Sequence, residues 1–225
     1  MDGTALDRIL GNRRPLRESN RLNTDLPAED ADLVRRALDD DREAFGELVR
    51  RYQNRIFAAI YRILGNREDA REFAQETFLR AFAKLSTFRE GARFSTWLYT
   101  IALNLTRSEL RKRKVRKDVK PLSLDAAPPG EEARPAEPKD VTESPAETVG
   151  RRELYRLALR EIGEMEPDMR EVVVLRDMQD LSYEEIAGAI GCPVGTVRSR
   201  LFRARRLLRD RLSPMVDGRR AGGAA

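Results

Sequence analysis

The chain has 225 residues, of which 40% are hydrophobic and 36% charged, with a net charge of +5 and a sequence pI of about 9.6. The absence of histidine and the single cysteine, Cys192, exclude zinc fingers, disulfide frameworks and histidine-based catalysis, and no glycine-rich phosphate loop or paired-carboxylate site is evident. No apolar run of membrane-spanning length and no signal peptide is found, so we expect a cytoplasmic protein that is not an enzyme, with no metal, cofactor or small-molecule ligand and no direct insertion into a membrane.

The chain begins with a polar segment and then takes on a helical pattern. Residues 1–28 show little apolar periodicity and predict a mobile N-terminal extension. Apolar residues recur at three- and four-residue steps from near Asp30, which predicts a first helical domain over 29–114. A long helix should end at Gly65, a second should begin after Asn66, and a third should begin at Ser95 or Thr96. The core positions expected of the second helix are Phe73, Thr77, Phe78, Ala81, Phe82 and Leu85, and those of the third are Trp97, Ile101 and Leu105.

A basic cluster ends this domain and an acidic tether follows it. The stretch from Arg107 to Lys120 holds eight basic and two acidic residues. Residues 115–149 contain six of the 11 prolines of the chain with acidic residues among them, a composition that cannot bury enough apolar surface to fold. We expect a flexible linker there, with a mean span of about 33 Å for roughly 35 coil residues.

Residues 150–212 predict a second helical domain that ends in a helix-turn-helix, followed by a disordered tail over 213–225. Ser182 and Glu185 have the spacing of a capping box, and Gly191 stands where a left-handed residue would end that helix. In the next helix one apolar face is made by Val197, Leu201, Ala204 and Leu208. No segment has a strand pattern, so the predicted fold is all-α, with two small helical domains joined by a flexible, acidic, proline-rich linker.

Seven arginines fall between Arg198 and Arg211, against one aspartate. An arginine-rich amphipathic helix is often only a solvated face. The capping box, the turn at Gly191 and the buried position of Val197 instead favour two helices held at a steep angle, as entry into a major groove requires. Cys192, in the turn between them, is most simply a small buried residue. Two basic surfaces separated by an acidic tether indicate a polyanion held in two places.

Three blocks of this sequence, QETFLRAF (75–82), FREGARFSTWLYTIALN (88–104) and LSYEEIAGAIGCPVGTVRSRLFRAR (181–205), closely resemble extracytoplasmic-function (ECF) sigma factors of bacteria, the sigma-E-like branch. The resemblance covers about 30–112 and 150–211. Members of that family are promoter-recognition subunits of bacterial RNA polymerase, built from two helical domains called region 2 and region 4. The resemblance therefore implies core RNA polymerase, through its largest-subunit clamp helices and its flap, and promoter DNA as partners. It also implies control by an anti-sigma factor in an envelope or other stress response.

The resemblance assigns the helix over 66–85 to docking on the polymerase clamp. A solvated charged face is the plainer interpretation of its polar side chains. Carboxylate and amide groups could instead pair with basic residues of a partner. The residues expected to dock are Asp69, Glu72, Gln75, Glu76 and Arg80.

The block 88–104 and the basic cluster would bind and melt the −10 promoter element. An unstacked base needs a basic backbone track and planar or apolar walls. Trp97 also fits a core position, and Asn104 is the better candidate for reading a base edge. The resemblance implies that these contacts come from Phe88, Arg89, Arg93, Phe94, Trp97, Tyr99, Asn104, Arg107, Arg111 and Lys112, with Arg113 and Lys114 also available to phosphates.

The second domain would read the −35 element through the second helix of its helix-turn-helix. Arginines that bond a guanine in a bidentate manner discriminate bases, whereas contacts to phosphate only position the protein. Arg198, Ser199, Phe202 and Arg203 are expected at the bases, and Thr196, Arg200 and Arg205 at phosphates.

The sequence therefore predicts a sigma factor that directs promoter recognition, DNA melting and transcription initiation. The alternative is a stand-alone helix-turn-helix regulator that uses its first domain for sensing or dimerisation. A structural nucleoid protein is the third possibility. The acidic docking helix and the aromatic and basic block of the first domain favour the sigma factor.

Overall fold

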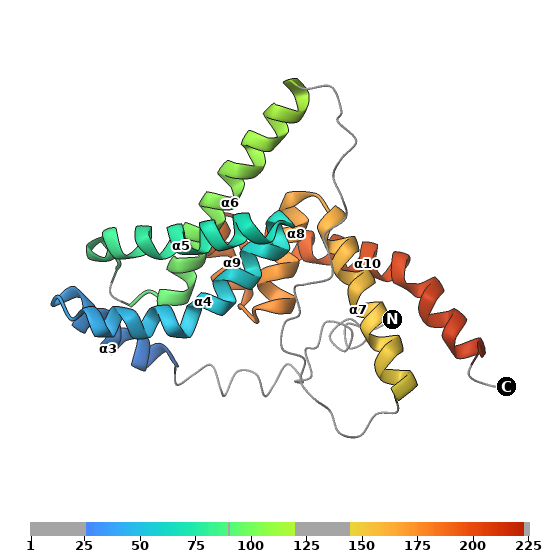
Figure 1. Ribbon diagram of the computed structural model, residues 1–225, viewed down its shortest axis with the longest axis horizontal. Helices are drawn as coiled ribbons and strands as arrows, with labels where there is room; N and C mark the ends of the chain where they lie inside the picture. Colours follow the sequence, from blue (N-terminus) through green and yellow to red (C-terminus); the bar gives the residue numbers. More distant parts are fainter. Residues whose placement is uncertain (1–25, 90, 120–144, 223–225) are drawn as a thin grey trace.

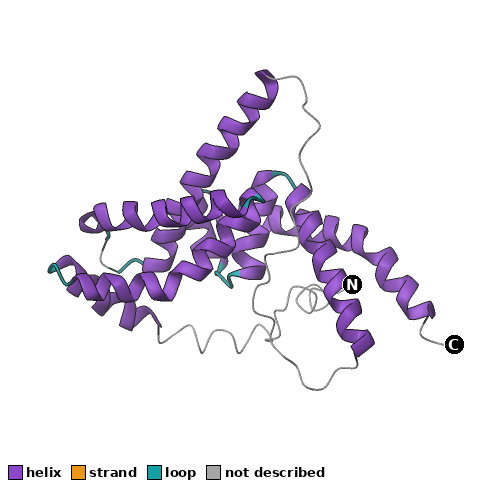
Figure 2. Cartoon of the chain, in the orientation of Figure 1, coloured by secondary structure: helices purple, strands orange, loops and turns teal. Residues whose placement is uncertain are grey.

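The computed structural model describes residues 26–89, 91–119 and 145–222, and in these ranges the chain is helical and contains no strand (Figure 2). The predicted all-α fold is confirmed. Two groups of helices follow each other along the chain, and Figure 1 shows them lying against one another. We call α3–α6 the amino-terminal bundle and α7–α10 the carboxy-terminal bundle.

The amino-terminal bundle packs three helices around the long α4. Its elements are α3 (Leu26–Leu38), α4 (Arg42–Leu64), α5 (Arg67–Ala83), the short 3-10 turn η1 (Leu85–Thr87) and α6 (Phe94–Val119). The far end of α6 projects away from the other helices (Figure 1).

The carboxy-terminal bundle is built from shorter helices that pack on one long one. Its elements are α7 (Pro145–Glu164), α8 (Pro167–Val173), the π-helical turn η2 (Val174–Met178), α9 (Tyr183–Ile190) and α10 (Val194–Gly222). Pro167 occupies the first turn of α8, where its missing N–H is not needed.

Local chemistry fixes the ends of α4 and α5. The Asp41 side chain accepts a hydrogen bond from the Ala44 N–H and so caps the start of α4. Gly65, with φ of 73°, ends α4 in a left-handed conformation and donates its N–H to the Tyr61 carbonyl. Asn66 then caps α5 through the Asp69 N–H. The predicted break at Gly65 and Asn66 is confirmed.

A single apolar core runs through both bundles. It includes Leu48, Ile56 and Ile60 of α4, which are fully buried, and continues to Ile186 of α9 and Leu208 of α10. A continuous core means that the bundles share buried surface, which is the main source of stability for such packing.

The helix ends differ from the predicted boundaries at several places. The first helix begins at Leu26, and residues 1–25 of the predicted extension lie outside the described residues. Helix α6 runs to Val119 and α7 begins at Pro145, so both ends of the predicted linker 115–149 are helical, while 120–144 lie outside the described residues. Between Phe94 and Pro121 the sequence contains neither glycine nor proline, so nothing stops α6 before Val119. Pro145 stands in the first turn of α7, a position that suits proline.

The carboxyl-terminal segment of the chain also differs from the prediction. Helix α10 continues to Gly222 across most of the segment 213–225 that was expected to be a disordered tail. Pro214 lies within this helix and does not end it.

Candidate nucleic-acid interface

Helices α9 and α10 and the short turn between them form the helix-turn-helix. Its capping box is present: the Glu185 N–H donates to Ser182 Oγ at 3.1 Å, and the Ser182 N–H donates to Glu185 Oε2 at 2.8 Å. Gly191, with φ of 74°, closes α9 by donating its N–H to the Ala187 carbonyl at 2.9 Å. The predicted capping box and left-handed glycine are confirmed, and together they fix the start and the end of α9.

Helix α10 buries one face and presents another to solvent. Val197, Leu201, Ala204 and Leu208 are buried, as their spacing predicts. The opposite side exposes Arg198, Ser199, Phe202 and Arg203. Phe202 is 69% exposed, and a phenylalanine so exposed on a surface of arginines is suited to contact with a partner rather than with the core.

Three residues expected at phosphates lie differently. Thr196 is half-buried at the start of α10. Arg200 forms an ion pair with Asp168 of α8. Arg205 bonds Asp177 of η2, which is only 3% exposed, through both Nε and Nη2. These two arginines tie α10 to the rest of the carboxy-terminal bundle.

An aromatic cluster marks the start of α6. The ring centroids of Phe88 and Trp97 lie 5.4 Å apart, and those of Phe94 and Trp97 lie 5.8 Å apart. Phe88 and Trp97 are half-buried, whereas Phe94 is 3% exposed. Trp97 thus combines core packing with a partly accessible ring, which is compatible with both interpretations given to it.

Tyr99, on the same helix, lies beneath the carboxy-terminal bundle. It is 1% exposed, and its hydroxyl donates to Gln179 Oε1 at 3.0 Å. Burial raises the pKa of Tyr99 to about 12. Phe94 and Tyr99 are both buried in this arrangement, so the direct contact with nucleic acid that was predicted for them would require this packing to change.

Some basic residues of this region are exposed, whereas Arg93, although 46% exposed, and Arg107 each bond a carboxylate of the carboxy-terminal bundle. Arg89, Asn104, Arg111 and Lys112 are exposed. Arg93 instead bonds Glu185 of α9 at 3.0 Å, through Nη1 and Oε1. Arg107 is half-buried and bonds both carboxylate oxygens of Glu171 in α8, and this hydrogen bonding raises the pKa of its guanidinium.

The predicted docking residues of α5 also differ in accessibility. Glu72, Gln75 and Arg80 are exposed. Half-buried Glu76 accepts from Arg80 Nε at 2.6 Å within α5. Half-buried Asp69 accepts instead from Arg113 of α6.

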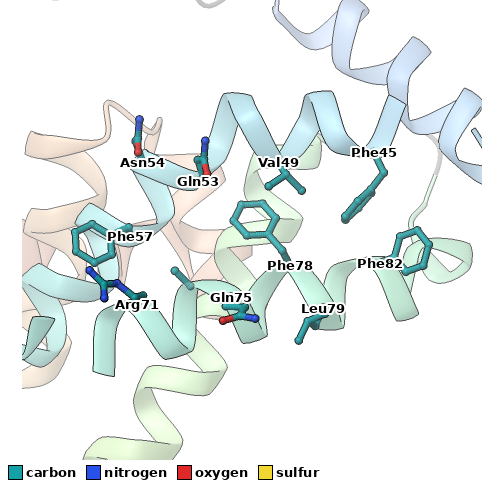
Figure 3. A pocket seen from close by; sticks show the side chains of 11 residues that line it. Phe45, Val49, Gln53, Asn54, Phe57, Arg71, Gln75, Phe78, Leu79 and Phe82 are labelled. Atoms are coloured by element: carbon teal, nitrogen blue, oxygen red, sulfur yellow. The ribbon is translucent and has the colours of Figure 1, made fainter. Parts of the chain in front are cut away.

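A groove between α4 and α5 adjoins these residues, with a volume of about 520 Å³. Figure 3 shows Phe45 and Val49 of α4 reaching toward Phe78 and Phe82 of α5. Phe82 was expected in the core and that prediction is wrong: it is 52% exposed and packs edge-on against Phe45, with ring centroids 5.0 Å apart. Leu79 beside it is 58% exposed.

Sequence reasoning missed this groove because α5 carries two apolar faces rather than one. Phe78 belongs to the buried face, while Leu79 and Phe82 form a second. The adjacent apolar pairs at 78–79 and 81–82 are the signal that could have revealed it.

Over residues 26–89, 91–119 and 145–222, no group of three or more metal-ligating side chains gathers. Nor does any helix in those ranges have the length and apolar character needed to cross a membrane.

Comparison with known proteins places these surfaces in a family. Residues 48–116 match the family model described as Sigma-70 region 2, and residues 155–208 match Sigma-70, region 4. The RNA polymerase sigma-H factor of Pseudomonas aeruginosa is 37% identical over 190 residues, which cover 84% of this chain and 96% of that protein. The ECF RNA polymerase sigma-E factor of Haemophilus influenzae is 35% identical, with 83% and 97% covered.

The chain belongs to the ECF sigma factors. The amino-terminal bundle carries region 2, and the carboxy-terminal bundle carries region 4. The ECF RNA polymerase sigma-E factor of Escherichia coli is likewise 35% identical over 82% of this chain. As a sigma factor, the chain is a transcription initiation factor that directs promoter-specific transcription.

Two solved structures share the fold of this sigma factor. CnrH in complex with the cytosolic domain of CnrY superposes with a TM-score of 0.60 at 24% identity, covering 83% of this chain and 98% of CnrH. The sigma factor RpoE of Bartonella quintana, in complex with the anti-sigma factor NepR, gives 0.56 at 24% identity, covering 75% and 96%.

Proposed function

We propose that this ECF sigma factor docks on core RNA polymerase through the α4–α5 groove, reads the −35 element with α10 and melts the −10 element with α6. The observation that carries the docking surface is the exposed apolar floor of the groove. Leu79 and Phe82 line the groove, and each is more than half exposed. Apolar surface of this kind marks a protein contact.

The polar rim of the groove suits a helical partner. Gln75 and Arg71 line it, and Glu72 and Arg80 are exposed on the same helix. An interface with an apolar centre and a polar rim excludes water from its middle and sets the register at its edge. The clamp helices of the largest polymerase subunit are the partner proposed for this surface, and the flap is the partner proposed for the carboxy-terminal bundle.

For the −35 element, the exposed side of α10 supplies the reading groups. Arg198 and Arg203 are available to the acceptor atoms of guanine, and Phe202 lies between them to contact a thymine methyl or a sugar. Arg200 and Arg205 act chiefly by orienting α10, because each is already paired within the bundle.

For the −10 element, the exposed residues of the α6 region provide a basic track. Arg89, Arg111 and Lys112 would contact phosphates, and Asn104 would read a base edge. The half-buried ring of Trp97, backed by Phe88, offers a flat surface beside the point of strand separation.

An anti-sigma protein is the proposed regulator. CnrH and the Bartonella RpoE, which share this fold, were each solved in complex with another protein, CnrY and the anti-sigma factor NepR. A stress-responsive role for this chain follows from its relatives and extends this proposal.

Binding to purified core polymerase tests the docking surface. Leu79→Ser with Phe82→Ser should weaken core binding at least about tenfold, the loss expected when apolar anchors of an interface are removed. Leu38→Ser is the matched control, because Leu38 is a 47% exposed leucine on α3, outside the groove. Unchanged core affinity of the double variant, measured by fluorescence anisotropy, would contradict the assignment.

A further inference from the structure

We propose that Tyr183 is a positioning residue for −35 recognition, whose ring holds the guanidinium of Arg198 where it can read a base. The proposal rests on the proposed function, which assigns Arg198 to the bases of the −35 element. It adds that a residue at the start of α9, the first helix of the helix-turn-helix, contributes to sequence specificity. Tyr183 does so through α10, without touching a base itself.

Two arginines lie over the ring of Tyr183. The guanidinium carbon of Arg198, in α10, is 5.7 Å from the ring centroid, and that of Arg176, in η2, is 5.2 Å from it. At both distances the negative face of an aromatic ring attracts a cation. The tyrosine therefore connects three elements of the carboxy-terminal bundle, and one of its two arginines belongs to the surface assigned to DNA.

The ring is better fixed than the Arg198 side chain that it contacts. Tyr183 is half-buried and packs against the apolar core as the first residue of α9. Arg176 is also half-buried, and its Nη1 donates to the Leu181 carbonyl at 2.7 Å. Arg198 is exposed. The core and Arg176 thus hold the ring, and the ring restrains the exposed arginine.

A ring restrains an arginine differently from a carboxylate. Arg200 and Arg205 are held by aspartates, which accept hydrogen bonds from their guanidinium groups. An aromatic face attracts a guanidinium electrostatically and leaves its five N–H donors available. Guanine O6 and N7 need two of those donors. Arg198 is therefore restrained in a way that does not compete with the base it is proposed to read.

This restraint should raise both affinity and specificity. A free arginine side chain loses much rotational freedom when it binds, and holding it near its bound position beforehand lowers that cost. Fewer alternative positions also leave fewer ways for Arg198 to bond a neighbouring base. An exposed cation–π contact corresponds to roughly a two- to fivefold change in an equilibrium constant, which sets the size of the expected effect.

A purely structural role for the ring would give a different pattern. Tyr183 would then stabilise the helix-turn-helix as a whole, and its loss would weaken reading by Arg203 as much as reading by Arg198. The positioning role instead predicts a loss confined to the base that Arg198 reads. The two roles are therefore separated by measuring base preference position by position.

Substitutions at Tyr183 can remove the aromatic face alone. Tyr183→Leu keeps an apolar side chain against the core, Tyr183→Phe keeps the ring without its hydroxyl, and Tyr183→Met is a second variant without the ring, should leucine unfold the bundle. The capping box is made by Ser182 and Glu185 and stays intact. Tyr61→Leu is the matched control, because Tyr61 of α4 is also half-buried, lies 5.7 Å from the Arg62 guanidinium and does not line the groove.

Selection from randomised promoters measures the base preferences. The probe is a promoter fragment, mapped by run-off transcription, whose upstream element is replaced by random base pairs. Core polymerase carrying each full-length variant selects fragments, which are sequenced. The position at which Arg198→Ala loses its preference is the base that Arg198 reads. Tyr183→Leu should relax the preference at that position roughly two- to fivefold, whereas Tyr183→Phe and Tyr61→Leu should retain it.

An unchanged preference at that position in Tyr183→Leu would overturn the proposal. Equal relaxation at every position of the element would also overturn it, because that is the pattern of a structural role.

A double-variant cycle tests the same dependence by affinity for the preferred promoter. Tyr183→Leu combined with Arg198→Ala should bind no more weakly than Arg198→Ala alone, since the ring then has no reading group to hold. Tyr183→Leu combined with Arg203→Ala should multiply the two separate losses. Multiplied losses in both combinations would contradict the proposal.

Failure of the proposed function would look different from failure of this inference. Without any transcript from the unmodified chain, or with no position affected by Arg198→Ala, the assignment of Arg198 to the −35 element would fall, and this inference with it. A position that depends on Arg198 but not on Tyr183 would overturn the positioning role alone.

Discussion

At the scale of single residues, the arginines of α10 fall into two groups, those exposed to solvent and those paired with carboxylates of the same bundle. Arg198 and Arg203 are exposed, and the Arg198 guanidinium rests 5.7 Å from the ring centroid of Tyr183. Arg205 bonds an almost fully buried aspartate, Asp177. The same residue type therefore serves recognition on one side of the helix and architecture on the other.

Alanine at the exposed positions should impair DNA recognition alone. Arg198→Ala and Arg203→Ala should each cost about 1–3 kcal/mol of binding to the −35 duplex, the worth of a bidentate arginine–guanine pair. The thermal unfolding midpoint should change little, because neither side chain is buried and an exposed cation–π contact such as that of Arg198 with Tyr183 contributes only about 0.5–1 kcal/mol. Electrophoretic mobility shift with the −35 duplex measures the first effect and calorimetry the second. Full affinity in both variants would refute the assignment.

Arg205→Ala should instead destabilise the protein. It removes the guanidinium that pairs with the buried Asp177 carboxylate, which costs about 3 kcal/mol of the free energy of unfolding. Denaturant titration measures this loss. Arg206→Ala is the control: its side chain is 66% exposed and its pair with Asp210 is 3.8 Å long, so the change should be under about 1 kcal/mol. Equal stability of the two variants would contradict a structural role for Arg205.

At the scale of elements, local chemistry determines where helices begin and end. Ser182→Ala should reduce the stability of the carboxy-terminal bundle by about 1 kcal/mol, because the Glu185 N–H loses its acceptor. Ser182→Asp should retain most of it, since a carboxylate also accepts that bond. Amide hydrogen exchange in α9 measures the effect, and protection unchanged in the alanine variant would show that the cap contributes little.

Elements of this kind were predictable from sequence because their signals are local. The capping box at Ser182, the left-handed Gly191 and the apolar face from Val197 to Leu208 each depend on residues within a few positions. The sequence did not predict that α6, α7 and α10 extend into the ranges expected to be linker and tail. Charged residues, such as those near Lys114, are compatible with a helix as well as with a coil. Phe82 was wrongly placed in the core because, in the sequence, two separate apolar faces of α5 cannot be distinguished from one wide apolar face.

At the scale of the whole molecule, the packing of the bundles could not be predicted. Arg107 and Glu171 are 64 residues apart, and no local pattern pairs them. The sequence shows each as a charged residue on a helix. Only the fold reveals that Glu171 is buried and that the Arg107 guanidinium reaches its carboxylate. The sequence predicted which residues make up the candidate site. It did not predict which of them form ion pairs within the chain.

Tyrosine titration reports on this packing. With its pKa raised to about 12 by burial, Tyr99 contributes stability below pH 10, roughly the ordinary tyrosine pKa, and this is lost as the pH rises through about 12. Absorbance titration should show a late tyrosine that Tyr99→Phe removes. Tyr52, whose pKa is also raised by burial, should remain late in both proteins and serves as the internal control. Identical titration curves would mean that Tyr99 is solvated and the bundles lie apart.

The measurement that tests the central claim most directly is run-off transcription on genomic DNA fragments, with purified core RNA polymerase, with and without this chain. A sigma factor should produce discrete new transcripts whose start sites share two upstream elements. The Leu79→Ser/Phe82→Ser variant should reduce their yield with the start sites unchanged. No transcript and no association with core polymerase, together with tight binding to duplex DNA alone, would contradict the account and identify a stand-alone regulator.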